Sequence, residues 1–375
     1  MTSAARQEET EQASVAFHIA LSEIGVQTTA EALALWSEVP AARRAATAGG
    51  WLRRAISLVM GRRRQSRDLA RAYYRLARAL LTGTTVADPY HPEPAYVTLT
   101  DLREQFAALA GGHYTPPAPE LGGEAATVER GEASPAPTPV TGSVEDGAQV
   151  APDVDQELDD EGWERILVEE LEGLRDEEER IEREAEEELR TVLDALGTAN
   201  LDRRLSQVDE EQPARDADRQ RAEAHRQAGA QQAAAASRVA MHGGRSAIWT
   251  HMRRDRRALG YVRVSRTGTP CGFCAMLISR GVAYKSEASA TFADGDLYHD
   301  NCHCYAAPIF SRQQFGASEL FALNREYEAL WPKVTKGHVG KSALTVWRRF
   351  IRQKQRERQK AAAQEARAAS TAQET

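Results

Sequence analysis

The sequence predicts a mainly α-helical protein with one small α+β domain near its C-terminus. Aromatic residues make up only 6% of the 375 residues, and the mean hydropathy of −0.54 is low for a single large compact core. Charged residues fall into long blocks, which is typical of solvated helical faces. The predicted segments are a helical N-terminal domain (1–112), a disordered Pro-rich linker (113–155), a long acidic and Ala-rich helical region (156–240), a zinc-stapled α+β domain (241–335) and a basic C-terminal helix and tail (336–375).

The N-terminal domain is predicted to consist of short helices separated by glycines. Apolar residues recur at helical spacing from 14 to 37, and Gly25 suggests a break within this stretch. Gly49–Gly50 is predicted to end the next segment. Gly83 is then expected to stop the domain, after a helical pair at 51–60 and 66–81.

The middle of the chain reads as a linker followed by a long helix. Residues 113–152 are rich in Pro, Gly, Ala, Thr and Glu, and they offer too little apolar surface to offset the entropy of ordering. Residues 156–196 predict an acidic helix, along which apolar residues from Trp163 to Leu196 recur at heptad-like spacing. Two interpretations stay open: a solvated helix with one packed stripe, or self-association through a coiled coil.

Helical composition resumes at 214 and leads toward the cysteine-rich region. A break is expected at Gly243–Gly244, followed by another helix to about 258. Tyr261–Val264 then has the β-branched and aromatic composition of a strand.

The net charge of −7 conceals blocks of opposite sign. Residues from about 43 to 78 and from about 341 to 360 are basic, whereas residues from about 153 to 188 are acidic. The basic blocks predict either contact with an acidic surface or DNA, or ordinary solvated helix faces. The N-terminus lacks an apolar signal core and no apolar run is long enough to cross a bilayer, so we expect a protein without membrane contact in a reducing cytoplasm.

All four cysteines lie in one short window, where thiols of a reduced protein tend to bind metal. The window contains Cys271-Gly-Phe-Cys274 and His299-Asp-Asn-Cys302-His303-Cys304. A C-x₂-C pair is the usual metal knuckle, and a strand beginning at Cys302 would point Cys302 and Cys304 to one face.

We therefore predict a closed, structural zinc site made from Cys271, Cys274, His299 and one of Cys302 or Cys304. His303 is expected to lie outside the ligand set. The alternatives are disulfides formed after release from the cell, or six residues with no metal.

Enzymatic interpretations find little support in the sequence. Pro270-Cys271-Gly-Phe-Cys274 matches half of the zinc-deaminase signature, but the single H-x-E, His91-Pro92-Glu93, lies far upstream. A βαβ pattern for a thioredoxin-like role, a G-x-S-x-G elbow and a phosphate-binding glycine loop are missing. We therefore expect a protein that is not an enzyme.

The cysteine region resembles the MuF-like minor capsid proteins, the head-morphogenesis proteins of tailed bacteriophages, and most of all those of phages of actinobacteria. The resemblance covers about residues 240–312. It rests on three runs: Arg257-Ala-Leu-Gly-Tyr-Val-Arg-Val264, Pro270-Cys-Gly-Phe-Cys-Ala-Met-Leu-Ile-Ser-Arg-Gly281, and Tyr298-His-Asp-Asn-Cys-His-Cys304.

The resemblance implies a virion protein in the capsid interior or at the portal vertex, made in the host cytoplasm. Its implied partners are the portal protein, the scaffold or the major capsid protein, and packaged DNA. Protease and toxin modules that are fused to some relatives are not visible in this chain. The alternative function is a zinc-containing DNA-binding protein associated with packaged phage DNA.

Overall fold

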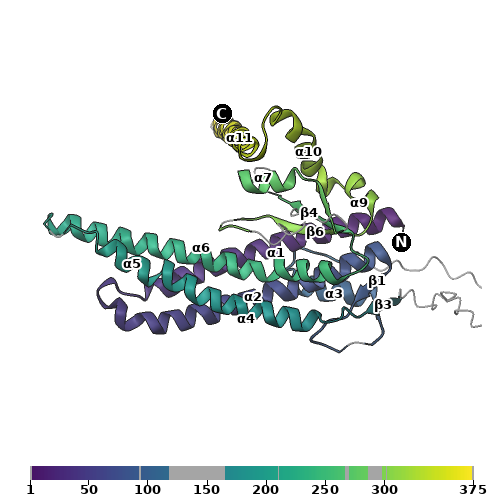
Figure 1. Ribbon diagram of the computed structural model, residues 1–375, viewed down its shortest axis with the longest axis horizontal. Helices are drawn as coiled ribbons and strands as arrows, with labels where there is room; N and C mark the ends of the chain where they lie inside the picture. The colour runs from purple at the N-terminus through teal and green to yellow at the C-terminus, as the bar shows by residue number, and fades with distance from the viewer. Residues whose placement is uncertain are drawn as a thin grey trace, which may run out of the picture.

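The computed structural model describes residues 2–117, 165–266, 270–285 and 298–373, except for positions 93, 210 and 301. Four long helices lie side by side in an elongated bundle (Figure 1): α1 (Ser3–Ser37), α2 (Arg44–Thr82), α4 (Leu174–Leu196) and α6 (Ala214–Arg254). The short helices η1 (Ala41–Arg43) and α5 (Thr198–Leu205) connect them. The predicted mainly α fold class is confirmed. Among the described helices, none is both long and apolar enough to cross a membrane.

A small sheet at one end of the bundle joins segments that are far apart in the chain. It contains β1 (Thr84–Val86), β2 (Tyr96–Thr98) and β3 (Arg165–Glu169), with β3 in the middle, parallel to β1 and antiparallel to β2. Helix α3 (Leu99–Leu109) follows β2 and begins with a capping box between Thr98 and Asp101.

The prediction of a helix across 165–169 is therefore wrong, because this short segment gains its hydrogen bonds from strands about 70 to 80 residues earlier in the chain. Most of the predicted linker, and Trp163, lie outside the described residues.

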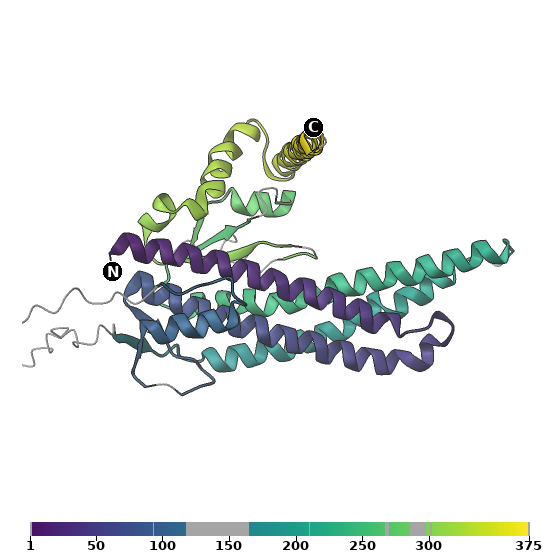
Figure 2. The ribbon, with the colours of Figure 1, turned by 180° about the vertical axis from the view of Figure 1, so that it is seen from behind.

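A second sheet carries the C-terminal part of the protein. Strand β4 (Gly260–Val264) lies between β5 (Val282–Tyr284) and β6 (Tyr305–Ile309), antiparallel to both, which confirms the strand expected at Tyr261–Val264. In both views of the ribbon the sheet lies between the bundle and the last helices (Figures 1 and 2). Those helices are α7 (Gly272–Ile278), α9 (Arg312–Ala317), η3 (Glu319–Phe321), α10 (Ala322–Val334) and α11 (Gly340–Gln373).

Four predicted helix breaks are wrong, because α1 and α6 continue through Gly25 and Gly243–Gly244, and α2 continues through Gly49–Gly50 and through residues 61–65, between the predicted helices 51–60 and 66–81. Two of these glycines lie where helices approach each other closely. A Cβ on Gly25 would lie 2.5 Å from Met241 Sδ, and a Cβ on Gly244 would lie 2.6 Å from the carbonyl oxygen of Ser66. The stop at Gly83 is confirmed, with φ of +73°. Gly25 and Gly244 thus allow close helix packing rather than turns.

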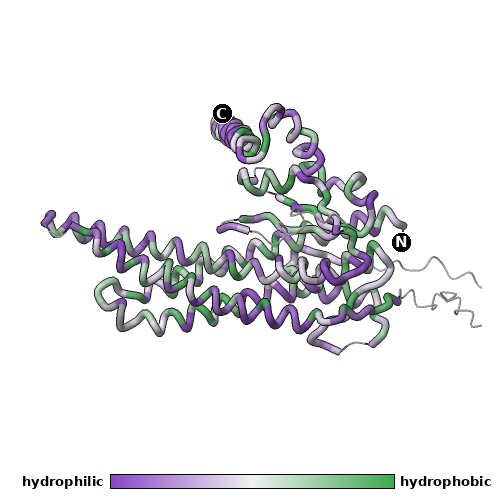
Figure 3. The backbone as a smooth tube through the Cα atoms, viewed as in Figure 1, coloured by the Kyte–Doolittle hydropathy of each residue, from purple (hydrophilic) through white to green (hydrophobic). Residues whose placement is uncertain are grey.

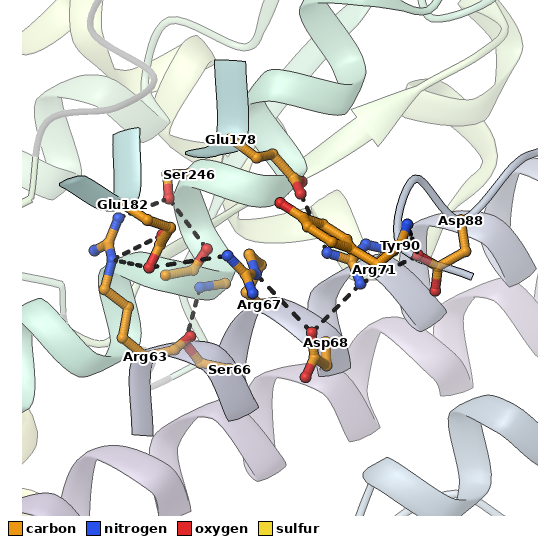
Figure 4. A network of polar contacts seen from close by, with 12 residues as sticks. Arg63, Ser66, Arg67, Asp68, Arg71, Asp88, Tyr90, Glu178, Glu182 and Ser246 are labelled. Carbon is orange, nitrogen blue, oxygen red and sulfur yellow. Dashed lines mark hydrogen bonds and ion pairs between the residues drawn. The ribbon is translucent and has the colours of Figure 1, made fainter. Parts of the chain in front are cut away.

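The basic and acidic blocks of the sequence partly neutralise each other inside the bundle (Figure 4). Arg63 of α2 binds Glu182 of α4 at 2.9 Å. Arg71 binds the buried Glu178 at 3.1 Å. Four arginines of the 43–78 block are buried inside the fold: Arg63, Arg71, Arg75 and Arg78. These side chains neither form a solvated helix face nor contact an external acidic surface or DNA, so both interpretations of the block are wrong for them.

The apolar seam of the acidic helix packs on its own chain. Leu189 and Leu193 of α4 are fully buried in a core that also contains Trp51 of α2 and Ala236 of α6. Most other positions of α4 are exposed and hydrophilic (Figure 3). This arrangement is the packed-stripe interpretation of 174–196, and self-association through a coiled coil stays a prediction.

Candidate metal centre

Helix α7 and the segment before β6 bring all five predicted ligands together. Cys271 lies at the N-cap of α7 and accepts a hydrogen bond from the Cys274 N–H at 3.3 Å, which is the turn expected of a C-x₂-C knuckle. Gly281 follows the helix with φ of +64°, a left-handed conformation that glycine adopts readily at a helix C-terminus. Cys302 and Cys304 immediately precede β6. The residue after Cys304, Tyr305, pairs with Val264 of β4, and this pairing positions the two cysteines at the start of the strand.

The donor atoms form two overlapping groups that share Cys274. One group is Cys271, Cys274 and His299, and the other is Cys274, Cys302 and Cys304; within each group the donors lie within 4.8 Å of one another. The structure therefore brings both Cys302 and Cys304 to Cys274 rather than only one of them. All four cysteines are free thiols, so the structure contains none of the disulfides considered above.

Within each group of three, the donor spacing is close to that of tetrahedral zinc. Zinc binds thiolate at about 2.3 Å and imidazole at about 2.0–2.1 Å, which places neighbouring donors about 3.3–3.8 Å apart. Cys274 Sγ lies 3.4 Å from Cys302 Sγ and 3.8 Å from His299 Nε2. Cys271 Sγ lies closer to His299 Nε2, at 2.9 Å. These residues fit a metal ion bound through sulfur and nitrogen.

His299 has the orientation of a metal ligand. Its Nδ1 lies 2.7 Å from the carbonyl oxygen of Asp300, which can only accept a hydrogen bond, so Nδ1 carries the hydrogen. In the neutral ring, Nε2 then presents its lone pair to Cys271 and Cys274. A backbone carbonyl behind the ring is a common way to fix the tautomer of a metal-bound histidine.

Two of the four thiols, Cys271 and Cys302, are favoured for ionisation, whereas hydrogen bonds with neighbouring thiols and burial raise the pKa of Cys274 and Cys304. Hydrogen bonding with the Cys274 thiol, helped by the Cys274 N–H and His299, lowers the pKa of Cys271 to about 5. Hydrogen bonds with Cys274 and Cys304 likewise hold the pKa of Cys302 far below its usual value, and the charge of Arg245 adds to this effect. Burial opposes protonation of His299, but its bonds with Asp300 and Cys271 dominate and raise its pKa. A thiolate is the form of cysteine that binds metal.

The cluster is enclosed by the C-terminal helices. Cys274, Cys302 and Cys304 are buried in a small core with Tyr327 of α10 and Trp347 of α11. Gly272 allows this approach, because a Cβ there would lie 3.0 Å from Arg348 Cγ of α11. Metal bound by these residues would hold α7 to the segment before β6, inside the core that side chains of α10 and α11 complete.

Two buried arginines beside the cluster were not identified from the sequence. Arg245 of α6 and Arg263 of β4 place their guanidinium carbons 4.2 Å and 4.0 Å from the centroid of the Tyr298 ring. Arg263 and Tyr298 occur in the runs that carry the family resemblance, whereas Arg245 belongs to no motif. His303 is exposed and belongs to neither donor group.

Residues 199–330 match the family described as VG15 protein, a family of viral gene products of the phage type. The match begins in α5 and ends in α10, so it contains all five candidate ligands. It indicates a phage-related protein, which is the broader part of the expectation drawn from the cysteine region. No curated protein and no solved structure matches the chain.

Proposed function

We propose that this chain is a non-enzymatic head-assembly protein of a tailed phage, of the MuF-like type, stabilised by one structural zinc ion. The observation that carries the proposal is the convergence of five sulfur and nitrogen donors around Cys274, inside the segment that matches a phage family. With four protein ligands a zinc site has no open position for substrate, so its role is to hold the fold.

The bundle suits an assembly factor that contacts several large partners. Helices α4, α5 and α6 extend well beyond the sheet and present long hydrophilic surfaces (Figures 1 and 3). We propose the portal protein, the scaffold or the major capsid protein as partners, and the capsid interior or portal vertex as the location.

Metal analysis of the purified protein tests the zinc site. We expect about one zinc ion per chain, as a closed four-ligand site requires. Cys274→Ser should abolish stoichiometric zinc, because Cys274 belongs to both donor groups. His303→Ala is the matched control, since His303 is exposed and outside both groups, and it should retain zinc. A wild-type protein purified without metal, and unable to take up zinc after reduction, would refute the site.

The assembly role is tested in the phage that encodes the chain. We expect the protein in procapsids and virions, and we expect Cys274→Ser to give particles of normal appearance with reduced infectivity. His303→Ala should leave infectivity unchanged. Absence of the wild-type protein from both kinds of particle would contradict the assembly role without bearing on the zinc site.

A second candidate function is DNA binding, which the surface of α11 favours. Its outer part is exposed and rich in cations, with Arg352, Arg356 and Lys360 among them. Binding to duplex DNA should weaken steeply as salt rises, because phosphate contacts release counterions. If the wild-type protein shows no retention on DNA at low salt, this candidate fails.

A further inference from the structure

Arg245 is a buried cation that is directed at the candidate metal centre. It lies on α6 with only 2% of its surface exposed. Its Nη2 donates a hydrogen bond to the carbonyl oxygen of Cys302, and its guanidinium stacks over the Tyr298 ring at 4.2 Å. Two further nitrogens, Nε and Nη1, are buried without a hydrogen-bond partner among the described residues.

Within the part of the chain that the structure describes, Arg245 forms no ion pair with a carboxylate. The groups that favour its charge are Tyr298, Cys302 and Cys304, whereas the neighbouring Arg263 disfavours it. A buried charge without a partner of opposite sign is strongly destabilising. Among the described residues, the place where such a partner can arise is the cysteine cluster.

Metal binding would create that negative charge. A zinc ion with three thiolates and one imidazole has a net charge of about −1, and one with four thiolates has about −2. The loaded centre and the guanidinium are therefore complementary, and each lowers the cost of burying the other.

We infer that Arg245 is the buried counter-charge of an anionic zinc–thiolate centre and strengthens metal binding through its charge. This role rests on the proposed zinc site. It also links the metal to the bundle, because Arg245 extends from α6, the longest helix, to the backbone of a ligand residue. Arg245 is thus a positioning residue that stabilises the ligands from outside the coordination sphere.

Two substitutions separate the charge of Arg245 from its hydrogen bond. Arg245→Lys keeps the positive charge, whereas Arg245→Gln keeps a donor for the Cys302 carbonyl and removes the charge. Zinc affinity of the full chain is measured by competition with a chromophoric chelator. We expect Arg245→Gln to weaken zinc binding by about 10- to 100-fold, the usual effect of losing an outer-shell group, and Arg245→Lys to stay within about threefold of wild type.

A matched control removes a different contact between α6 and the same segment. Arg238 of α6 binds Asp300 at 2.7 Å, but both side chains are partly exposed. Arg238→Gln should change zinc affinity by less than about threefold, because exposed ion pairs contribute little. If Arg238→Gln and Arg245→Gln lost equal amounts of zinc affinity, attachment of the segment with Asp300 and Cys302 to α6 would matter rather than buried charge. That result would overturn the inference.

Cobalt substitution provides a readout that does not depend on affinity. The sulfur-to-cobalt charge-transfer band reports thiolates bound to the metal, and its energy responds to nearby charge. We expect this band to shift in Arg245→Gln and to return in Arg245→Lys. An unshifted band together with wild-type affinity in Arg245→Gln would refute the role of Arg245, whereas a wild-type protein that binds neither zinc nor cobalt would instead refute the zinc site itself.

Discussion

His18 joins the N-terminal helix to the segment that carries the cysteines. The side chain is 8% exposed, and its Nε2 lies 2.8 Å from the carbonyl oxygen of His303. Because a carbonyl only accepts, the neutral ring donates from Nε2. Burial, helped by the nearby charges of Arg266 and Arg245, lowers the pKa of His18 to about 4. The folded protein therefore requires this histidine to be neutral.

This requirement predicts a loss of stability in mild acid. In the unfolded chain His18 binds a proton with a pKa of about 6.5, which is above the folded value. Protonation therefore favours the unfolded chain, so the free energy of unfolding has its full value above pH 6.5 and decreases as the pH falls toward 4. The maximum effect is roughly 3 kcal/mol. Urea unfolding of wild type and His18→Gln between pH 5 and 7 measures it. We expect a shallower pH dependence in His18→Gln, and an unchanged one in His338→Gln, whose side chain is exposed. Parallel curves for wild type and His18→Gln would contradict this expectation.

At the same scale, the candidate ligands were predictable and their surroundings were not. Cys271 and Cys274 carry their geometry in their own spacing, since a C-x₂-C pair closes a local turn. Arg245 approaches Cys302 from 57 positions earlier in the chain. No local pattern marks such a residue, because its environment exists only after α6 and β6 have packed together.

At the scale of helices and strands, periodicity predicted most of the helical segments, but several of the predicted helix breaks were wrong. Gly25 and Gly244 had the composition of breaks, yet both lie inside continuous helices. The reason is tertiary: at these positions another chain segment leaves no room for a Cβ. Strand β3 was missed for a related reason, because its hydrogen-bond partners are distant in sequence. Non-local contacts decide both outcomes.

The close crossing of α2 and α6 predicts opposite effects for two glycine substitutions. Gly244→Ala would bring a Cβ within 2.6 Å of the Ser66 carbonyl oxygen, so we expect a loss of about 1–3 kcal/mol in unfolding free energy from overpacking. Gly50→Ala in α2 meets nothing within 4 Å, and it should be neutral or stabilise the helix by up to about 1 kcal/mol. Equilibrium unfolding in urea measures both. Similar changes in the two variants would show that helix propensity, not helix crossing, governs Gly244.

At the scale of the whole molecule, the protein has separate apolar cores. One core extends from α1, α2 and α6 into the sheet of β4, β5 and β6. A smaller core contains the cysteines and side chains of α7, α10 and α11. The sheet connects the two, and ion pairs such as Arg78–Asp255, at 2.6 Å and almost fully buried, reinforce the larger one. The large buried apolar side chains of the smaller core are Ile278, Tyr327, Trp347 and Ile351, and a metal ion bound beside them would add to its stability.

This division predicts a local response to metal removal. After chelation we expect fast amide hydrogen exchange in α7 and in the first turns of α11, and exposure of Trp347, which is fully buried in the folded protein. Amides of α1, α2 and α6 should stay protected, because their core contains no candidate ligand. Cys274→Ser should reproduce the pattern without chelator, and zinc should restore protection in wild type only. Uniform loss of protection across the bundle would show that the metal stabilises the whole fold, and unchanged exchange in α7 would show that metal does not stabilise the smaller core.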